Sequence, residues 1–287
     1  MTDKIENAIL KFWGNKEKTF IKDDSGLPSD KAIDISVENA VKDLMARTLK
    51  RKQGEGANGE IKPVIINEIK EPLRKLYASD LSEKDFDEWH TNTCENILKV
   101  LQEKYINTDS TEVHYGKAQK ILNMTLKYLM CMDGAEKYEK KLHHCQMPLD
   151  SYTLEWIKRA CKKYNEKNDK IIVSKMPSWS VMDYGDGGSD IEKGKYTYNF
   201  FVKKIREFSK KNYGYSEEEY GKLTPLQAEF LIWPNIQMEL AAEAFIIKFK
   251  SNYCELNNKE KQEIKDMSLK DKLEMIECLL PKVRIEE

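Results

Sequence analysis

The stretch from Gly116 to Leu129 reads GKAQKILNMTLKYL and has the periodicity of an α-helix. At about 100° per residue, one side of this helix carries Gly116, Lys120, Asn123 and Lys127. The opposite side carries Ala118, Leu122, Thr125, Leu126 and Leu129. We therefore expect the apolar side to pack in the core and the lysine side to face something polar.

A carboxylate follows this helix at Asp150, in the segment PLDSY from Pro148 to Tyr152. The residues after Asp150 have helical periodicity, so the aspartate is expected to cap the N-terminus of the next helix. A helix N-terminus concentrates the positive ends of peptide dipoles. An amine and a capping carboxylate are thus offered by consecutive helical segments.

Most of the chain has helical periodicity, and strand-like alternation is missing, which predicts an all-α fold. The run 170–173 is the one serious strand candidate, and the glycine-containing stretches 53–59 and 183–190 are expected to be loops. We expect a single two-lobed helical domain over 1–287. The expected helices cover 5–13, 37–49, 65–77, 86–105, 117–132, 151–164, 198–211, 225–249 and 259–280.

The composition indicates a chain that folds without disulfides or metals. Its 287 residues are 40% hydrophobic, which is enough for a core. Its six cysteines form no C-x-x-C pair, and the run from His143 to Cys145 has no fourth ligand spaced for zinc. We expect reduced cysteines, no metal and no cofactor.

No apolar run is expected to span a bilayer, and the N-terminal residues lack the pattern of a signal peptide, so the predicted location is cytoplasmic. The formal net charge of −1 gives the molecule no overall attraction to nucleic acid. Any DNA site must be local, and the best candidate is the run Arg47, Lys50, Arg51 and Lys52. The alternative for this run is a solvated helix end beside a loop.

The lysine-bearing helix followed by Pro-x-Asp at the start of another helix resembles the helix-hairpin-helix superfamily of DNA glycosylases. The run from Gln119 to Lys127 is most similar to the archaeal 8-oxoguanine DNA glycosylase branch, in which a Gln-Lys pair is followed seven residues later by the catalytic lysine. The resemblance covers 86–163. The sequence from His114 to Lys117 departs from the usual Leu-Pro-Gly-x-Gly hairpin.

The resemblance implies a two-lobed glycosylase fold, with Lys127 as nucleophile and Asp150 as electrostatic stabiliser and proton acceptor. Lys120 would modulate the protonation of the nucleophile or contact phosphate. Lys120 is also the alternative nucleophile, because in the eukaryotic branch the catalytic lysine closely follows the hairpin glycines. Lys127 lies 23 residues before Asp150 and Lys120 lies 30, and the shorter reach favours Lys127.

The implied activity is excision of a flipped base from double-stranded DNA by a monomer, with a Schiff base and possible strand nicking at the abasic site. DNA contacts are expected from Gly116, Lys117, Gln119, Arg47, Lys50 and Arg51. Aromatic residues available for the base are Tyr152, Trp156 and Trp179. The base is expected to be oxidised guanine or a phage-type modified cytosine, so the role is repair or phage defence.

Structural alternatives exist for each of these residues. Lysines on an amphipathic helix usually face solvent, an isolated aspartate is usually a structural cap, and aromatic residues are usually core. The competing function is a helical binding or regulatory protein without catalysis, which would present apolar faces of 226–249 and 267–280 to a partner. A magnesium nuclease is disfavoured, because no carboxylates have metal-ligand spacing.

Overall fold

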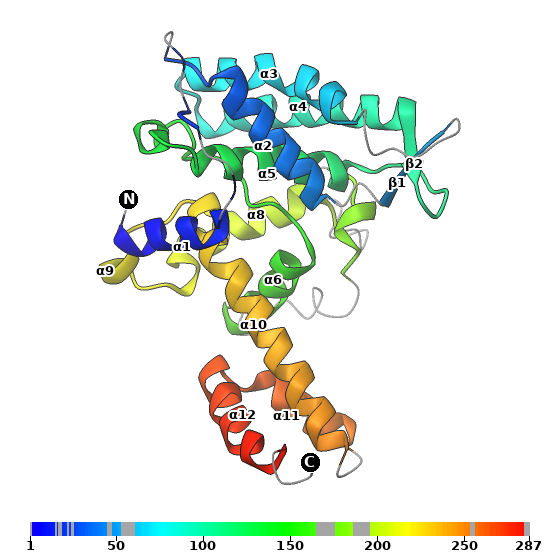
Figure 1. Ribbon diagram of the computed structural model, residues 1–287, viewed down its shortest axis with the longest axis vertical. Helices are drawn as coiled ribbons and strands as arrows, with labels where there is room; N and C mark the ends of the chain where they lie inside the picture. Colours follow the sequence, from blue (N-terminus) through cyan, green and yellow to red (C-terminus); the bar gives the residue numbers. More distant parts are fainter. Residues whose placement is uncertain are drawn as a thin grey trace. The chain divides into compact units, whose positions relative to one another are not determined.

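The computed structural model describes residues 2–14, 16, 19–21, 23, 26–44, 48–52, 61–164, 176–185, 196–252 and 256–283, with side chains to 279. The described chain is predominantly helical, which confirms the all-α class (Figure 1). It divides into two compact units, Met1–Leu231 and Ile232–Glu287. The segment 86–163, which carries the resemblance, lies wholly in the first unit.

Four helices form the centre of the first unit. They are α2 (Asp30–Asp43), α3 (Ile61–Ala78), α4 (Glu83–Lys104) and α5 (Tyr115–Met130). Each packs on the next in the order α2, α3, α4, α5, and α5 returns to pack on α2 (Figure 1). Serine side chains cap two of them, because Ser29 accepts from the Ala32 amide and Ser82 from the Asp85 amide.

Helix α5 is buried along its whole length, and this contradicts the structural alternative in which its lysines face solvent. All 16 of its residues are buried, including three lysines and the polar residues Gln119, Asn123 and Thr125. Buried polar groups are costly unless they are paired. The polar side of α5 therefore faces other protein groups rather than solvent.

The remaining elements of the first unit surround these four helices. Helix α6 has the bounds expected from the sequence, and α10 begins where expected but continues into the second unit. The elements are α1 (Asp3–Trp13), η2 (Ala135–Tyr138), α6 (Ser151–Tyr164), η3 (Trp179–Val181), α8 (Tyr198–Ser209), η4 (Asn212–Gly214), α9 (Glu217–Tyr220) and the first part of α10 (Pro225–Ser251).

A two-stranded antiparallel ribbon replaces the expected helical ends at 49 and 105. Strand β1 (Leu49–Arg51) pairs with β2 (Tyr105–Asn107), with Lys50 opposite Ile106. Lys50 and Arg51 therefore lie on a strand, and the Lys50 amine donates to the Ser110 hydroxyl at 2.8 Å. Arg47, the loop 53–59 and the strand candidate 170–173 lie outside the described residues.

The structure places β2 and a loop between α4 and α5, over residues 105–114. Gly116 belongs to the first turn of α5, and its amide donates to the Met182 carbonyl at 2.8 Å. The expected hairpin at 114–117 is thus the start of a helix that packs against a later segment. This corrects the idea that the Gly116 amide is available to a phosphate.

The second unit contains the rest of α10, then α11 (Asn258–Asp266) and α12 (Leu269–Val283). The expected single helix over 259–280 is interrupted, because Met267 is extended and the Ser268 side chain caps α12 through the Asp271 amide. The buried amine of Lys272 pairs with Glu243 at 2.8 Å. This ion pair joins α12 to α10 inside the unit.

By length and composition alone, α10 could cross a membrane, which corrects the expectation that no segment reaches that length. The helix has 27 residues, a mean hydropathy of 1.2 over its most apolar stretch, and a third of that stretch buried. Core helices of soluble proteins share these properties. The finding is therefore weak evidence for a membrane.

Candidate active site

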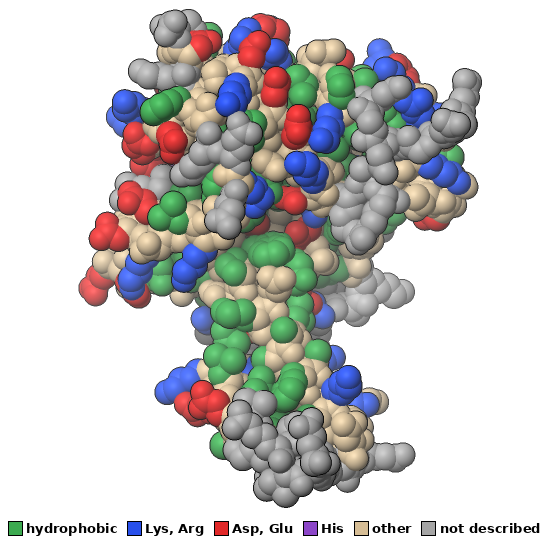
Figure 2. Space-filling model, in the orientation of Figure 1, with side chains coloured by type: hydrophobic (Ala, Val, Ile, Leu, Met, Phe, Trp, Pro, Cys, Tyr) green, Lys and Arg blue, Asp and Glu red, His purple; other side chains and the backbone are tan. Residues whose placement is uncertain are grey.

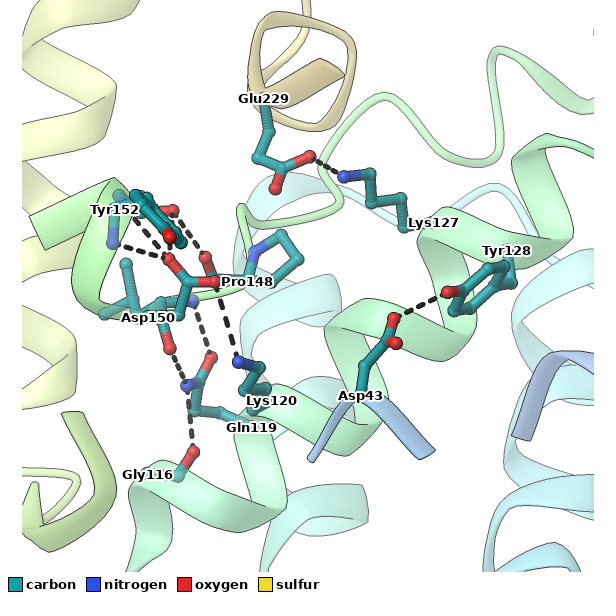
Figure 3. Close-up of polar contacts among 12 residues, drawn as sticks. Asp43, Gly116, Gln119, Lys120, Lys127, Tyr128, Pro148, Asp150, Tyr152 and Glu229 are labelled. Atoms are coloured by element: carbon teal, nitrogen blue, oxygen red, sulfur yellow. Dashed lines mark hydrogen bonds and ion pairs between the residues drawn. The ribbon is translucent and has the colours of Figure 1, made fainter. Parts of the chain in front are cut away.

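The structure brings Lys120 and Asp150 together. The Lys120 Nζ lies 3.5 Å from Asp150 Oδ2, and each side chain keeps 11% of its surface exposed (Figure 3). Lys120 comes from the middle of α5, and Asp150 comes from the residue before α6. The amine and the acid expected from consecutive helical segments thus meet, but through Lys120 rather than Lys127.

Asp150 uses its two oxygens differently. Its Oδ1 accepts hydrogen bonds from the amides of Tyr152 at 2.9 Å and Thr153 at 3.0 Å, so it caps α6 as the sequence predicted. Its Oδ2 faces Lys120. The cap fixes the direction of the carboxylate, and the second oxygen is thereby held toward the amine.

Gln119 sets the register between α5 and the segment before Asp150. Its Nε2 donates to the Leu149 carbonyl at 2.9 Å, and its Oε1 accepts from the Leu149 amide at 3.2 Å. Because Gln119 holds Leu149, the next residues along each segment, Lys120 and Asp150, lie opposite one another. Gln119 is fully buried in these bonds, so it positions the pair and is not available for the expected DNA contact.

Trp179 covers the Lys120 amine. The centre of its ring lies 4.5 Å from Lys120 Nζ and 5.8 Å from Lys117 Nζ, within the range of cation–π attraction. Gly116 makes this arrangement possible, since a Cβ at that position would stand 1.7 Å from the Trp179 carbonyl oxygen. The glycine is therefore required for the close approach of η3 to α5.

Gly116→Ala is expected to lower the free energy of unfolding by about 1–3 kcal/mol, because the added methyl group must displace the η3 backbone. Urea unfolding followed by circular dichroism measures this change. The corresponding change at another glycine, Gly26→Ala, is not a suitable control, because Gly26 has a φ of +80° and an alanine there would strain the backbone. Ala8→Gly in α1, at a half-buried helical position, controls for the change in helix propensity with less loss of packing. Equal stability of Gly116→Ala and the wild type would contradict the close approach.

Lys117 also lies near this pair. Its Nζ donates to the Thr48 hydroxyl at 2.7 Å, which ties the start of α5 to the residue before β1. Burial lowers the pKa of Lys117 to about 8, Asp109 opposes this shift, and Lys120 adds to it. A fraction of the Lys117 side chains is therefore uncharged at neutral pH.

Lys127 occupies a different environment from Lys120. Its amine forms a close ion pair with Glu229 at the start of α10, and both side chains are almost fully buried. The rings of Phe12 and Phe230 cover the amine, with centres 3.8 and 4.8 Å away. This corrects the assignment of Lys127 as nucleophile, because its amine is enclosed by aromatic rings and held by a carboxylate other than Asp150.

Glu229 belongs to the same charged cluster, and the sequence interpretation missed it. Burial raises the pKa of Glu229, the charge and hydrogen bond of Lys127 lower it, Asp150 raises it and Lys120 lowers it. The charges of Lys120, Lys127 and Asp150 thus all act on Glu229 inside the first unit. The available signal was a single acidic residue in the otherwise uncharged run from Leu226 to Ile232.

Trp156 and Tyr152, the other two aromatic residues expected to form the base pocket, do not cover the Lys120 amine as Trp179 does. Trp156 is buried in the core, with its ring centre 5.4 Å from Phe208 and 6.1 Å from Tyr213. Tyr152 is half-buried in the first turn of α6, and its amide donates to Asp150. The expectation that Trp156 stacks on a base is therefore corrected, because its ring is packed in the core. Of the three aromatic residues, Trp179 is the one whose ring lies beside Lys120.

Among the described residues, no three His, Cys, Asp or Glu side chains are grouped as metal ligands. The described cysteines Cys94, Cys131, Cys145 and Cys161 are buried free thiols, and Cys278 is an exposed one. Cys254 lies outside the described residues.

The comparisons with known proteins provide no relative from which a role could be transferred. No model of a protein family, no curated protein and no solved structure matches the chain. A functional assignment therefore depends on the chemistry of the Lys120–Asp150 pair and its surroundings.

Proposed function

We propose that the protein is a DNA glycosylase with lyase activity, in which Lys120 is the nucleophile and Asp150 the electrostatic stabiliser. The observation that carries this proposal is the 3.5 Å approach of the Lys120 amine, whose side chain is 11% exposed, to an oriented carboxylate. The Trp179 ring beside the amine adds a surface on which a base can stack. An amine, a carboxylate and an aromatic ring are the groups that this reaction needs.

In the proposed reaction, the target nucleotide leaves the helix and its C1′ approaches the Lys120 amine. The Lys120 ammonium first gives a proton to solvent, and the amine then forms a bond to C1′ while the bond from C1′ to the base breaks, so that the electron pair of that bond leaves with the base. The negative charge of Asp150 stabilises the positive charge that develops on the sugar. Asp150 then passes a proton from the new ammonium group to the departing base.

Ring opening at O4′ converts the product into a Schiff base between Lys120 and the deoxyribose. Loss of a C2′ proton then expels the 3′ phosphate by β-elimination and nicks the strand. The same covalent intermediate can be trapped by borohydride, which reduces the carbon–nitrogen double bond. Trapping is therefore the direct signature of an amine nucleophile.

DNA would be held by basic residues of the β1–β2 ribbon, which Lys117 links to the start of α5. Lys117 binds Thr48, and Thr48 directly precedes the strand that carries Lys50 and Arg51. On the face of the first unit visible in Figure 2, lysines and arginines are interspersed with acidic residues. Phosphate contacts are therefore proposed for Lys50 and Arg51 on this ribbon, rather than for a broad basic surface. Lys117 is 2% exposed and its amine is held by Thr48, which corrects the expected DNA contact at that residue.

The test uses purified protein and duplexes that carry oxidised guanine, hydroxymethylated cytosine, glucosylated hydroxymethylcytosine or an abasic site. Release of a free base and a borohydride-trapped adduct with the abasic duplex are expected. The absence of both products would refute the proposal. Tight association with another protein, without base release, would instead support the alternative function as a helical binding protein.

One observation favours that alternative. The described part of the second unit exposes large apolar side chains at Met238, Phe245 and Leu273, with 49%, 38% and 47% of their surfaces exposed. Exposed apolar residues that lie together can mark a binding surface. The glycosylase proposal does not require these residues, so a partner at the second unit and catalysis in the first unit are compatible.

A further inference from the structure

The Lys120 amine is too enclosed in the structure to meet a sugar. The Lys120 side chain is 11% exposed, with Asp150 Oδ2 3.5 Å from its Nζ and the centre of the Trp179 ring 4.5 Å from it. Bond formation requires C1′ to come within about 3–3.5 Å of the amine. A sugar with its attached phosphates needs a wider approach, so one neighbour of the amine has to move.

Asp150 and the helix that carries Lys120 are both fixed. The Asp150 Oδ1 accepts from two amides in the first turn of α6, and Gln119 holds the adjacent Leu149 by two further hydrogen bonds. Lys120 belongs to a helix that is buried along its whole length. Moving either element would break buried hydrogen bonds, and each broken bond costs free energy.

The segment that carries Trp179 is anchored on its C-terminal side. The Met182 carbonyl accepts from the Gly116 amide at 2.8 Å, and Met182 is 1% exposed. At the next residue, Asp183 Oδ1 lies 3.0 Å from His114 Nδ1, within hydrogen-bond distance. The chain is therefore held against the start of α5 from Met182 onward.

Residues 176–181, which precede this anchor, are held less firmly. Within the described chain, their hydrogen bonds all stay inside the segment or join it to the next residue, Met182. The Trp179 ring is attracted by the amines of Lys120 at 4.5 Å and Lys117 at 5.8 Å. Val181, two residues further on, is 45% exposed. The ring is therefore the neighbour of the amine that can move at the lowest cost.

The attraction between the ring and Lys120 depends on the charge of the amine. A cation–π contact requires the ammonium form, whereas nucleophilic attack requires the uncharged amine. Loss of the Lys120 proton therefore weakens the hold on the Trp179 ring. Two changes that each favour the other are coupled, so opening of the ring and activation of the nucleophile support one another.

We propose that the Trp179 ring is a gate, which lies over Lys120 in the free protein and moves away before a nucleotide reaches the amine. This inference rests on the proposed glycosylase function and adds the control of access to its nucleophile. The closed ring shields the amine from small aldehydes until DNA is bound. The anchor at Met182 keeps the open ring close to the site, where it can stack on the extruded base.

The test measures how fast Lys120 is methylated by formaldehyde and cyanoborohydride, with peptide mass spectrometry to read each lysine separately. Lys120 in Trp179→Ala is expected to react about 10-fold faster than in the wild type, because the cover is gone. Trp179→Phe should lie between the two, since the smaller ring attracts a cation less strongly. Lys137, which is exposed in the first unit, should react equally in all these proteins.

Trp89→Ala is the matched control, because Trp89 is a half-buried tryptophan on α4. Lys120 should react at the wild-type rate in this variant. The buried Lys127 should stay unmethylated in every variant that remains folded. Equal methylation of Lys120 in the wild type and in Trp179→Ala would overturn the gate.

Borohydride trapping on an abasic duplex separates the gate from the glycosylase function. This substrate has no base for Trp179 to stack on, so Trp179→Ala should form the adduct faster than the wild type in a single turnover. Slower trapping by this variant would overturn the gate. No trapping by either protein would refute the glycosylase function, while the methylation rates would still decide whether the ring shields Lys120.

Discussion

Lys120→Arg is expected to abolish borohydride trapping on abasic DNA, with a loss of at least about 10³-fold in adduct formation. Arginine keeps a positive charge opposite Asp150 and over the Trp179 ring, but its guanidinium stays protonated and does not form a Schiff base. Quantitative gel analysis of the adduct measures the effect. Because the ion pair is retained, the variant should remain folded.

Asp150→Asn tests the proposed electrostatic role of the carboxylate at the same site. Asparagine is also a good helix cap, so the amides of Tyr152 and Thr153 should remain satisfied. The carboxylate charge disappears, so base release should fall. The melting temperature should fall less than in Lys127→Met, because the helix cap is kept and the Lys120 side chain is 11% exposed rather than 3%. Full trapping by Lys120→Arg would contradict the assignment of Lys120 as nucleophile.

Lys127→Met is expected to lower the free energy of unfolding by about 3–5 kcal/mol, because it leaves the buried Glu229 carboxylate without its cation. Urea unfolding followed by circular dichroism at pH 7.5 measures the loss. Burial raises the pKa of Glu229 above its ordinary value of 4.5, and the variant lacks the Lys127 charge that opposes this rise. Glu229 therefore stays protonated in the folded variant at pH values somewhat above 4.5. The folded protein binds more protons than the unfolded one in that range, so the stability of Lys127→Met should fall as the pH rises above 4.5.

The double variant Lys127→Met/Glu229→Met separates stability from catalysis. Apolar residues of similar size can replace a buried ion pair at little cost, so most of the lost stability should return. Trapping should also be near the wild-type level, because Lys120 and Asp150 are unchanged. A stable double variant that no longer forms the adduct would assign the nucleophile to Lys127 instead.

Local sequence features predicted much of the helical framework. The bounds of α6 and the start of α10 are those expected, and Asp150 caps α6 as predicted. Capping residues and apolar periodicity act within a few residues along the chain, so one sequence reveals them. The class of the fold follows from these features.

The choice of lysine could not be predicted in this way. Periodicity places Lys120 and Lys127 on the same side of α5, but it cannot distinguish a solvated side from a side that is buried against charged partners. The partner of Lys127 is Glu229, 102 residues later in the sequence. The β1–β2 ribbon was missed for a related reason, since its short strands pair residues more than 50 positions apart.

The complete burial of α5 has a consequence for how a substrate would be accommodated. Amide protons of such a helix exchange with solvent chiefly when the whole domain unfolds, and elements of this kind are the least plastic parts of a protein. The proposed nucleophile is therefore carried by a rigid element and cannot travel far toward a sugar. In the proposed reaction, adaptation must come from the nucleic acid and from the segment that carries Trp179, so the proposal requires the duplex to bend.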